Sequence, residues 1–146
     1  MKTRILKISV AVLGVLVLVG TIFLWGASRE VNFLKEGSVK GFNLTGVYRD
    51  HKSSLSSLSF HAENNNRWQV VETEGTIING TFKTTDDPNM FSLIDKDGNE
   101  YGVVRLAYVS SKEDDGRLYL TNKSGTILFD KITNLPGFVV DATTTS

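Results

Sequence analysis

Residues 89–109 read Asn89-Met-Phe-Ser-Leu-Ile-Asp-Lys-Asp-Gly-Asn-Glu-Tyr-Gly-Val-Val-Arg-Leu-Ala-Tyr-Val109. Apolar residues recur at alternate positions on both sides of a polar centre, and this period of two is typical of β-strands that bury one face. The centre, Lys96-Asp-Gly-Asn99, favours a turn, because glycine adopts positive φ and Asp and Asn tolerate turn geometry. The stretch therefore predicts two antiparallel strands, 89–95 and 100–109, that are joined by a tight hairpin.

The same alternation of short β-branched and aromatic runs with Gly, Asn, Asp and Ser clusters extends from Leu44 to Ile132. Short, turn-like connections imply that consecutive strands pair as neighbours. A meander with one apolar face can close on itself and remove its edges. The fold class we predict is all-β, a single antiparallel eight-stranded up-and-down barrel, with a β-sandwich as the alternative. The expected strands are 44–50, 55–62, 67–73, 76–84, 89–95, 100–109, 117–122 and 126–132.

Alternation also predicts which side chains point inward. Val104, Leu106 and Tyr108 share one face of the longest strand and are expected in the core, which places Arg105 outside. The alternative is an inward Arg105, which would need a carboxylate or a bound anion as its partner. With many large side chains inside, we expect at most a shallow pocket near one mouth of the barrel. The side chains expected to meet in the core are Phe60, Trp68, Phe82, Phe91, Leu106 and Leu120.

An uncharged run, Ile8–Ser28, lies between Lys7 and Arg29. As a helix it would be about 30 Å long, which matches the hydrocarbon core of a bilayer. Lys2, Arg4 and Lys7 precede the run, so the positive-inside rule places the N-terminus in the cytoplasm. The expected location is therefore the cytoplasmic membrane, with a single span and the C-terminal domain outside.

The alternative to an anchor is a cleaved secretory signal, because Gly26-Ala27-Ser28 supplies small residues and cleavage after Ser28 is compatible with them. The apolar run is longer than a typical signal core, and Trp25 does not suit cleavage after Ala27, so we expect an uncleaved anchor. The predicted organisation is a cytoplasmic N-terminus (1–7), a transmembrane helix (8–28), a juxtamembrane linker (29–43), a β-barrel domain (44–132) and a C-terminal tail (133–146).

Charge and cysteine content exclude several classes of protein. The chain has 16 basic and 16 acidic residues, but four of the basic and one of the acidic residues precede Val31, so the remainder is acidic by three charges. A net acidic domain argues against nucleic acid as a partner. The chain contains no cysteine, which excludes a disulfide scaffold and a cysteine-linked lipid anchor, and fits a bacterial surface protein better than an animal ectodomain.

The sequence contains no complete catalytic or metal-binding motif. His51 and His61 are the only histidines and have no neighbouring ligands in the sequence. The segment Asp95–Glu100 has only part of a calcium-loop pattern and favours a hairpin turn, and Glu113-Asp-Asp115 favours a solvated loop tip. The Ser-rich segment 53–59 lacks a nucleophile elbow. We therefore predict a protein that is not an enzyme and has no metal and no cofactor.

Several short segments together resemble small lipocalin-like (calycin-type) barrels of bacterial membrane-anchored proteins. They are Gly46-Val-Tyr48, Trp68, Gly80-Thr-Phe82, Leu93–Gly98, Leu118-Tyr-Leu120 and Gly125–Lys131. The resemblance covers about residues 44–132 and implies a barrel. Tyr48 stands where lipocalins have the Trp of Gly-x-Trp, and no binding residue is carried over from the family.

These features predict a single-pass membrane protein that presents a β-barrel outside the cell and binds a protein partner or a small apolar ligand. The alternatives are a structural or accessory subunit of a membrane complex and a secreted lipocalin-like carrier. Phe138 is expected to cap the barrel mouth. The side chains expected to contact a ligand or partner are Trp68, Arg105, Tyr108 and Phe138.

Overall fold

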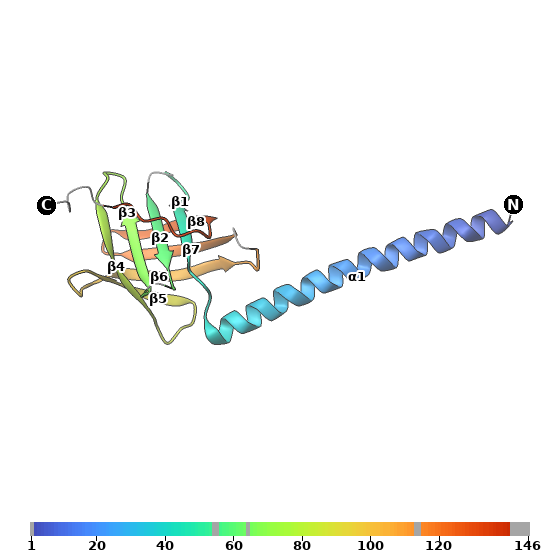
Figure 1. Ribbon diagram of the computed structural model, residues 1–146, viewed down its shortest axis with the longest axis horizontal. Helices are drawn as coiled ribbons and strands as arrows, with labels where there is room; N and C mark the ends of the chain where they lie inside the picture. The colour runs from blue at the N-terminus through green and yellow to red at the C-terminus, as the bar shows by residue number, and fades with distance from the viewer. Residues whose placement is uncertain (1, 54–55, 64, 113–114, 141–146) are drawn as a thin grey trace.

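The computed structural model describes residues 2–53, 56–63, 65–112 and 115–140. Within these residues the chain forms one long helix, α1 (Lys2–Lys40), followed by eight strands. Figure 1 shows α1 projecting from one side of the strand domain with its N-terminal end far from it. The strands are β1 (Gly46–Asp50), β2 (Ser57–His61), β3 (Arg67–Val71), β4 (Ile77–Thr84), β5 (Met90–Asp95), β6 (Glu100–Val109), β7 (Gly116–Asn122) and β8 (Gly125–Thr133).

The eight strands form a closed antiparallel barrel. Each strand pairs with its neighbours in the sequence, and β1 pairs with β8 to complete the circle. Closure leaves no strand edge with unpaired backbone groups. The predicted up-and-down barrel is therefore confirmed, and the sandwich is excluded.

The interior of the barrel is filled with side chains. Five of the six residues predicted to meet in the core are buried, and Leu106 is partly buried and packs against them. The ring of Phe82 packs edge to face with Phe60 and Phe91, at centroid distances of 5.5 and 6.0 Å. Such packing adds to the stabilisation from burial of apolar surface.

Trp68 is fully buried on the inner face of β3 and holds two other strands together. Its indole Nε1 donates hydrogen bonds to the carbonyl oxygens of Thr81 and Ile94, both at 3.0 Å. Gly80 lies opposite Trp68, and a Cβ atom there would lie 1.8 Å from the Ile94 oxygen. Because glycine has no side chain, β4 and β5 approach closely at the point where the indole bonds to both.

The face of Tyr108 differs from the prediction. Leu106 pairs with the buried Leu118, but Tyr108 pairs with the exposed Arg117, so the register shifts between them. The shift takes up one additional residue, Ala107, as a β-bulge does. One residue of slip reverses the faces of a strand, so the inward prediction for Tyr108 is wrong, and its side chain is 49% exposed.

The sequence predicts a linker over 29–43, but α1 continues to Lys40. Gly41 follows the last helical residue with a φ of 84° and donates its N–H to the Gly37 oxygen at 2.9 Å, as is typical of a C-terminal glycine cap. Phe42 then folds back, and its ring lies 5.6 Å from that of Phe33 and against Gly37. The connection between helix and barrel is therefore packed and short.

Residues 134–140, which we call the C-terminal strap, run over the outer wall of the barrel. The Gln69 side chain is only 4% exposed, because its amide donates to the Val139 oxygen at 2.9 Å and accepts from the Val139 N–H at 2.7 Å. The Phe138 ring lies 5.1 Å from the Arg67 guanidinium and beside His61. Phe138 therefore covers the outer wall rather than the mouth, and the rest of the predicted tail, 141–146, lies outside the described residues.

Trp68→Ala should destabilise the barrel by about 3 to 5 kcal/mol, because it removes the largest buried side chain. This is a large share of a domain stability of roughly 5 to 15 kcal/mol. Urea unfolding of the full chain in detergent, followed by near-ultraviolet circular dichroism, measures the loss. Lys123→Ala, at an exposed turn, is the control and should change stability by less than about 0.5 kcal/mol. Equal unfolding midpoints for the two variants would contradict the role of Trp68.

Candidate functional site

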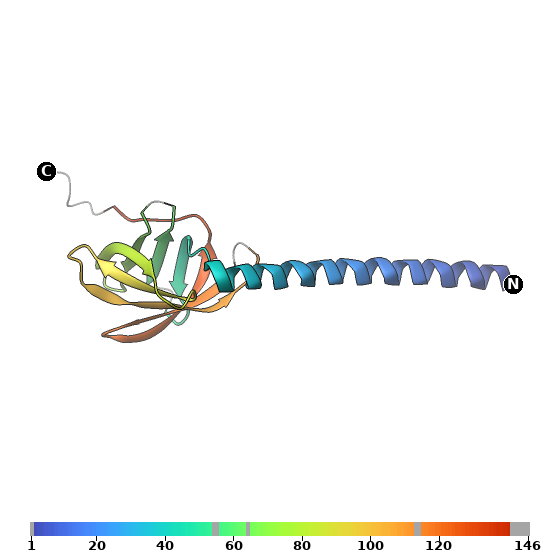
Figure 2. The ribbon, with the colours of Figure 1, turned by 90° about the horizontal axis from the view of Figure 1, so that it is seen from below.

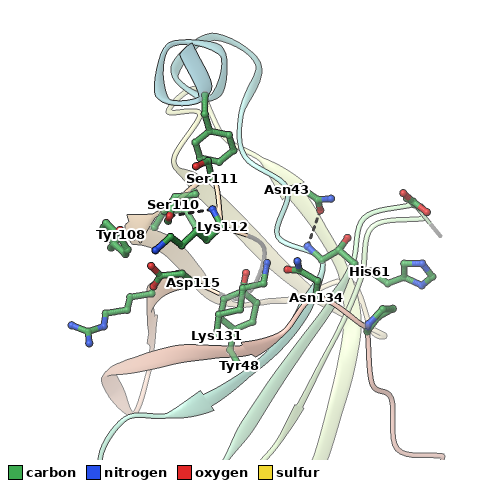
Figure 3. Close-up of a pocket in the computed structure, with 18 residues that line it drawn as sticks. Asn43, Tyr48, His61, Tyr108, Ser110, Ser111, Lys112, Asp115, Lys131 and Asn134 are labelled. Carbon is green, nitrogen blue, oxygen red and sulfur yellow. Dashed lines mark hydrogen bonds between the residues drawn. The ribbon is translucent and has the colours of Figure 1, made fainter. Parts of the chain in front are cut away.

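A cavity of about 470 Å³ opens at the end of the barrel beside α1 (Figure 3). Its walls come from the start of β1 and β7, the ends of β2, β6 and β8, the β6–β7 loop and Phe33 of α1. We call this opening the helix-proximal mouth. The polar or charged side chains of its lining that matter here are Tyr48, Glu63, Lys112, Asp115, Arg117 and Lys131.

Tyr48 separates the helix-proximal mouth from the core below it. Its ring is buried and packs edge to face on Phe60 at 5.8 Å, and its hydroxyl donates to the Leu44 oxygen at 3.0 Å. Burial raises the pKa of the Tyr48 hydroxyl far above its ordinary value, so the group stays neutral. The helix-proximal mouth thus lies above a packed core; the sequence predicted at most one shallow pocket, whereas cavities occur at both mouths.

Lys131 occupies an inward position of β8 at this mouth. Leu118 pairs with the buried Phe129, and Lys131 lies two residues further along the same face. Its ammonium nitrogen lies 5.6 Å from the centroid of the Tyr48 ring, within the range of a cation–π contact. The site therefore has a positive charge on its inner side.

The rim of the mouth has charges of both signs. Lys112 is basic and Glu63 and Asp115 are acidic, whereas the charge of Arg117 is compensated by its ion pair with Asp130. Glu113 and Asp114, which the sequence places beside Asp115, lie outside the described residues. A mixed rim suits a ligand with two charges of opposite sign better than a simple anion or cation.

Arg117 is held at the rim by Asp130. Its Nε lies 2.8 Å from one carboxylate oxygen of Asp130, and His51 Nδ1 lies 2.5 Å from the other. The hydrogen bond with His51 is the main cause that lowers the pKa of Asp130; partial burial opposes it, and the charges of His51 and Arg117 add to it. Asp130 therefore stays ionised and keeps the guanidinium in place.

A contact with α1 joins the helix to the β6–β7 end of the barrel. The Glu30 carboxylate accepts hydrogen bonds from the Ser111 N–H, at 3.3 and 3.4 Å from its two oxygens, and from the Ser111 hydroxyl. Figures 1 and 2 both show the β6–β7 end of the barrel on the side along which α1 runs toward its N-terminus. The β6–β7 end of the barrel therefore lies against α1, two residues beyond the end of the apolar run at Ser28.

The opposite mouth has a smaller, acidic cavity of about 310 Å³. There the Tyr101 hydroxyl donates to Glu72 Oε1 at 3.3 Å, and burial together with the Glu72 charge raises the pKa of Tyr101. Asp95 accepts from the backbone N–H groups of Asp97 and Asn99 at 2.9 and 2.8 Å, within the hairpin turn that joins β5 and β6. No group of three or more potential metal ligands occurs among the described residues.

The four residues predicted to contact a ligand or partner lie in four different places. Trp68 is enclosed in the core, and Phe138 lies on the C-terminal strap. Arg105 is exposed on the outer wall, where it pairs across the sheet with Tyr119. Only Tyr108 borders the helix-proximal mouth.

Sequence reasoning missed the charged residues of this mouth. Lys131 could have been found, because strand alternation places it on the same face as Phe129. Lys112 and Arg117 had no such signal, because Lys112 lies in a connection between strands and Arg117 lies on the exposed face of β7. Comparison of the chain with protein-family models, with curated proteins and with solved structures gives no match.

The Asp130→Asn variant should lose less folding stability than the wild-type chain when the pH is lowered. The pKa of Asp130 is lower in the folded chain than in the unfolded chain. Its contribution to folding stability is therefore complete above about pH 4 and is lost as the pH falls through the pKa of the folded chain. The effect should be on the order of 0.5 kcal/mol, because the ion pair is partly exposed. Unfolding free energies measured from about pH 6 to pH 2 should fall more steeply for the wild-type chain. Asp97→Asn, at the exposed β5–β6 turn, should keep the wild-type slope, and an unchanged slope for Asp130→Asn would contradict this assignment.

Proposed function

We propose that the protein is a single-pass membrane protein that holds a binding barrel at the outer face of the cytoplasmic membrane and is not an enzyme. The observation that supports this is the apolar helix Leu13–Val39, which is long and apolar enough to cross a membrane and is not buried against the barrel. Along it the side chains of Leu13, Phe23 and Leu24 are 66%, 75% and 71% exposed. Water disfavours so much contiguous apolar surface, and a bilayer would remove it.

The ends of the apolar run support the orientation. Lys2, Arg4 and Lys7 precede it, and positive charge is retained on the cytoplasmic side. At the other end the Arg29 guanidinium lies 5.1 Å from the Trp25 ring, and such a pair suits the interface between lipid and water. The barrel then lies outside the cell.

The distribution of space in the barrel supports binding at the mouth. The aromatic core fills the interior and leaves little room there for a ligand. The resemblance to lipocalin-like barrels therefore supports a barrel architecture, and we do not extend it to the carriage of an apolar ligand inside the barrel. The cavity at the helix-proximal mouth has a volume in the range of small-ligand sites and a rim with charges of both signs. A partner protein or a small ligand would contact this rim.

The uncleaved anchor can be tested in the native membrane. The protein should stay in the membrane fraction after a salt wash, its N-terminal sequence should begin at Met1 or Lys2, and protease added to wall-stripped cells should remove the barrel. An N-terminus at Arg29 would show a secreted protein instead. Protection of the barrel from protease would reverse the proposed topology.

Binding at the helix-proximal mouth can be tested by photo-cross-linking in intact membranes. A cross-linking amino acid in place of Tyr108, which is half exposed at the mouth, should give defined adducts. The same amino acid in place of Lys123, at the opposite mouth, is the matched control and should give few. Equal adducts from both positions would contradict a binding site at the helix-proximal mouth.

A further inference from the structure

We propose that α1 pairs with α1 of a second copy of this chain, in a parallel two-stranded arrangement. The proposal rests on the membrane anchor proposed above, because two copies inserted with the same orientation have parallel helices. It follows from a stripe of side chains that continues from the apolar run into the part of α1 nearest the barrel. We call this stripe the seam; its residues are Val17, Gly20, Leu24, Ala27, Val31 and Leu34.

The spacing of the seam is that of a coiled coil. Its residues recur at alternating intervals of three and four, which places them on one side of a helix. Val17 and Val31 occupy a positions and Leu34 occupies a d position, a combination that favours two parallel strands. Gly20 and Ala27 occupy d positions within the apolar run, where small side chains let two helices approach closely.

The part of the seam beyond the apolar run indicates a protein partner rather than lipid. Lipid can cover every apolar side chain within the run, but the run ends at Ser28. Val31 and Leu34 follow that end, and their side chains are 48% and 44% exposed. Water disfavours exposed apolar surface, and the same two residues of a parallel second copy lie at the same height and would cover it.

The barrel contacts a different side of α1 and leaves the seam open. Glu30 bonds to the β6–β7 connection, and Phe33 borders the helix-proximal mouth. Gly37 packs against Phe42, which leads into the barrel. Since successive residues of an α-helix are about 100° apart, these contacts lie roughly a quarter turn around the helix from the seam. A second helix can therefore reach the seam without displacing the barrel.

The charges beside the seam also favour a second copy in parallel. A g residue of one strand lies near the following e residue of the other strand in a parallel coiled coil. Glu30 occupies a g position and Lys35 the following e position, so the two would pair between copies. Lys35 is exposed and has no ion-pair partner among the described residues. A carboxylate has about four acceptor sites, so the contact with Ser111 does not exhaust Glu30.

Disulfide cross-linking of the full chain in native membranes tests the proposal, because the chain contains no cysteine of its own. Val31→Cys and Leu34→Cys should each give a covalent dimer on mild oxidation, since a disulfide needs Cα atoms about 4.4 to 6.8 Å apart. Asn32→Cys and Glu36→Cys, which are exposed on other sides of α1, are the matched controls and should give little dimer.

Sedimentation equilibrium of the full chain in density-matched micelles measures the pairing without a cross-link. The wild-type chain should have the mass of a dimer. Leu34→Lys places like charges opposite each other in the seam and should weaken dimerisation about tenfold. Lys35→Glu should also weaken it, because two carboxylates would then face each other. Asn32→Lys, outside the seam, should dimerise as the wild type does.

Three results would overturn the proposal. They are disulfide yields at the control positions equal to or above those at Val31 and Leu34, no covalent dimer from either seam position, and wild-type dimerisation of Leu34→Lys. Failure of the proposed anchor would instead show as a chain that begins at Arg29 and leaves the membrane fraction. Cross-linking is scored only on full-length chains in the membrane, so the two failures are distinguishable.

Discussion

Pairing between β1 and β8 is the constraint on which the rest of the molecule depends. These strands are the first and last of the meander, and their ladder, from Val47 opposite Thr133 to Asp50 opposite Phe129, turns an open sheet into a barrel. The same ladder places Tyr48 opposite Lys131 and thereby creates the charged inner side of the helix-proximal mouth. Closure of the sheet and formation of the candidate site occur together, because both require β1 to pair with β8.

Most of the barrel was predictable from local pattern, because alternation and turn residues act over a few neighbouring positions. The hairpin at 89–109 and the inward Phe82 and Trp68 depend on such short-range rules. The face of Tyr108 was not predictable, because a single additional residue, Ala107, reverses strand parity and has no distinctive residue type. A bulge of this kind is determined by the partner strand and not by the bulged sequence itself.

The candidate site was predictable only in part, because it is built from chain segments that are distant in sequence. Tyr108 was identified, and Lys131 could have been identified from its parity with Phe129. The orientation of the mouth depends on Glu30 reaching Ser111 across 81 positions of the chain. It also depends on α1 continuing through the segment predicted as a linker, where Gly37 and the mixed charge favoured a turn but the helix continues to Lys40. Contacts between residues so far apart in the sequence cannot be predicted from local sequence patterns.

The hydrogen bonds between the Gln69 side chain and the C-terminal strap let the closed barrel bind an extended chain segment, although it has no free strand edge. A barrel without free edges cannot add another strand, yet the primary amide of Gln69 presents an N–H donor and a carbonyl acceptor side by side, as the backbone of a strand edge does. The Gln69 amide therefore hydrogen-bonds with the backbone N–H and C=O of Val139, as a neighbouring strand would do. Because the pairing uses only backbone atoms of the strap, the wall can retain an extended chain with any side chain at position 139 except that of proline, which has no N–H to donate.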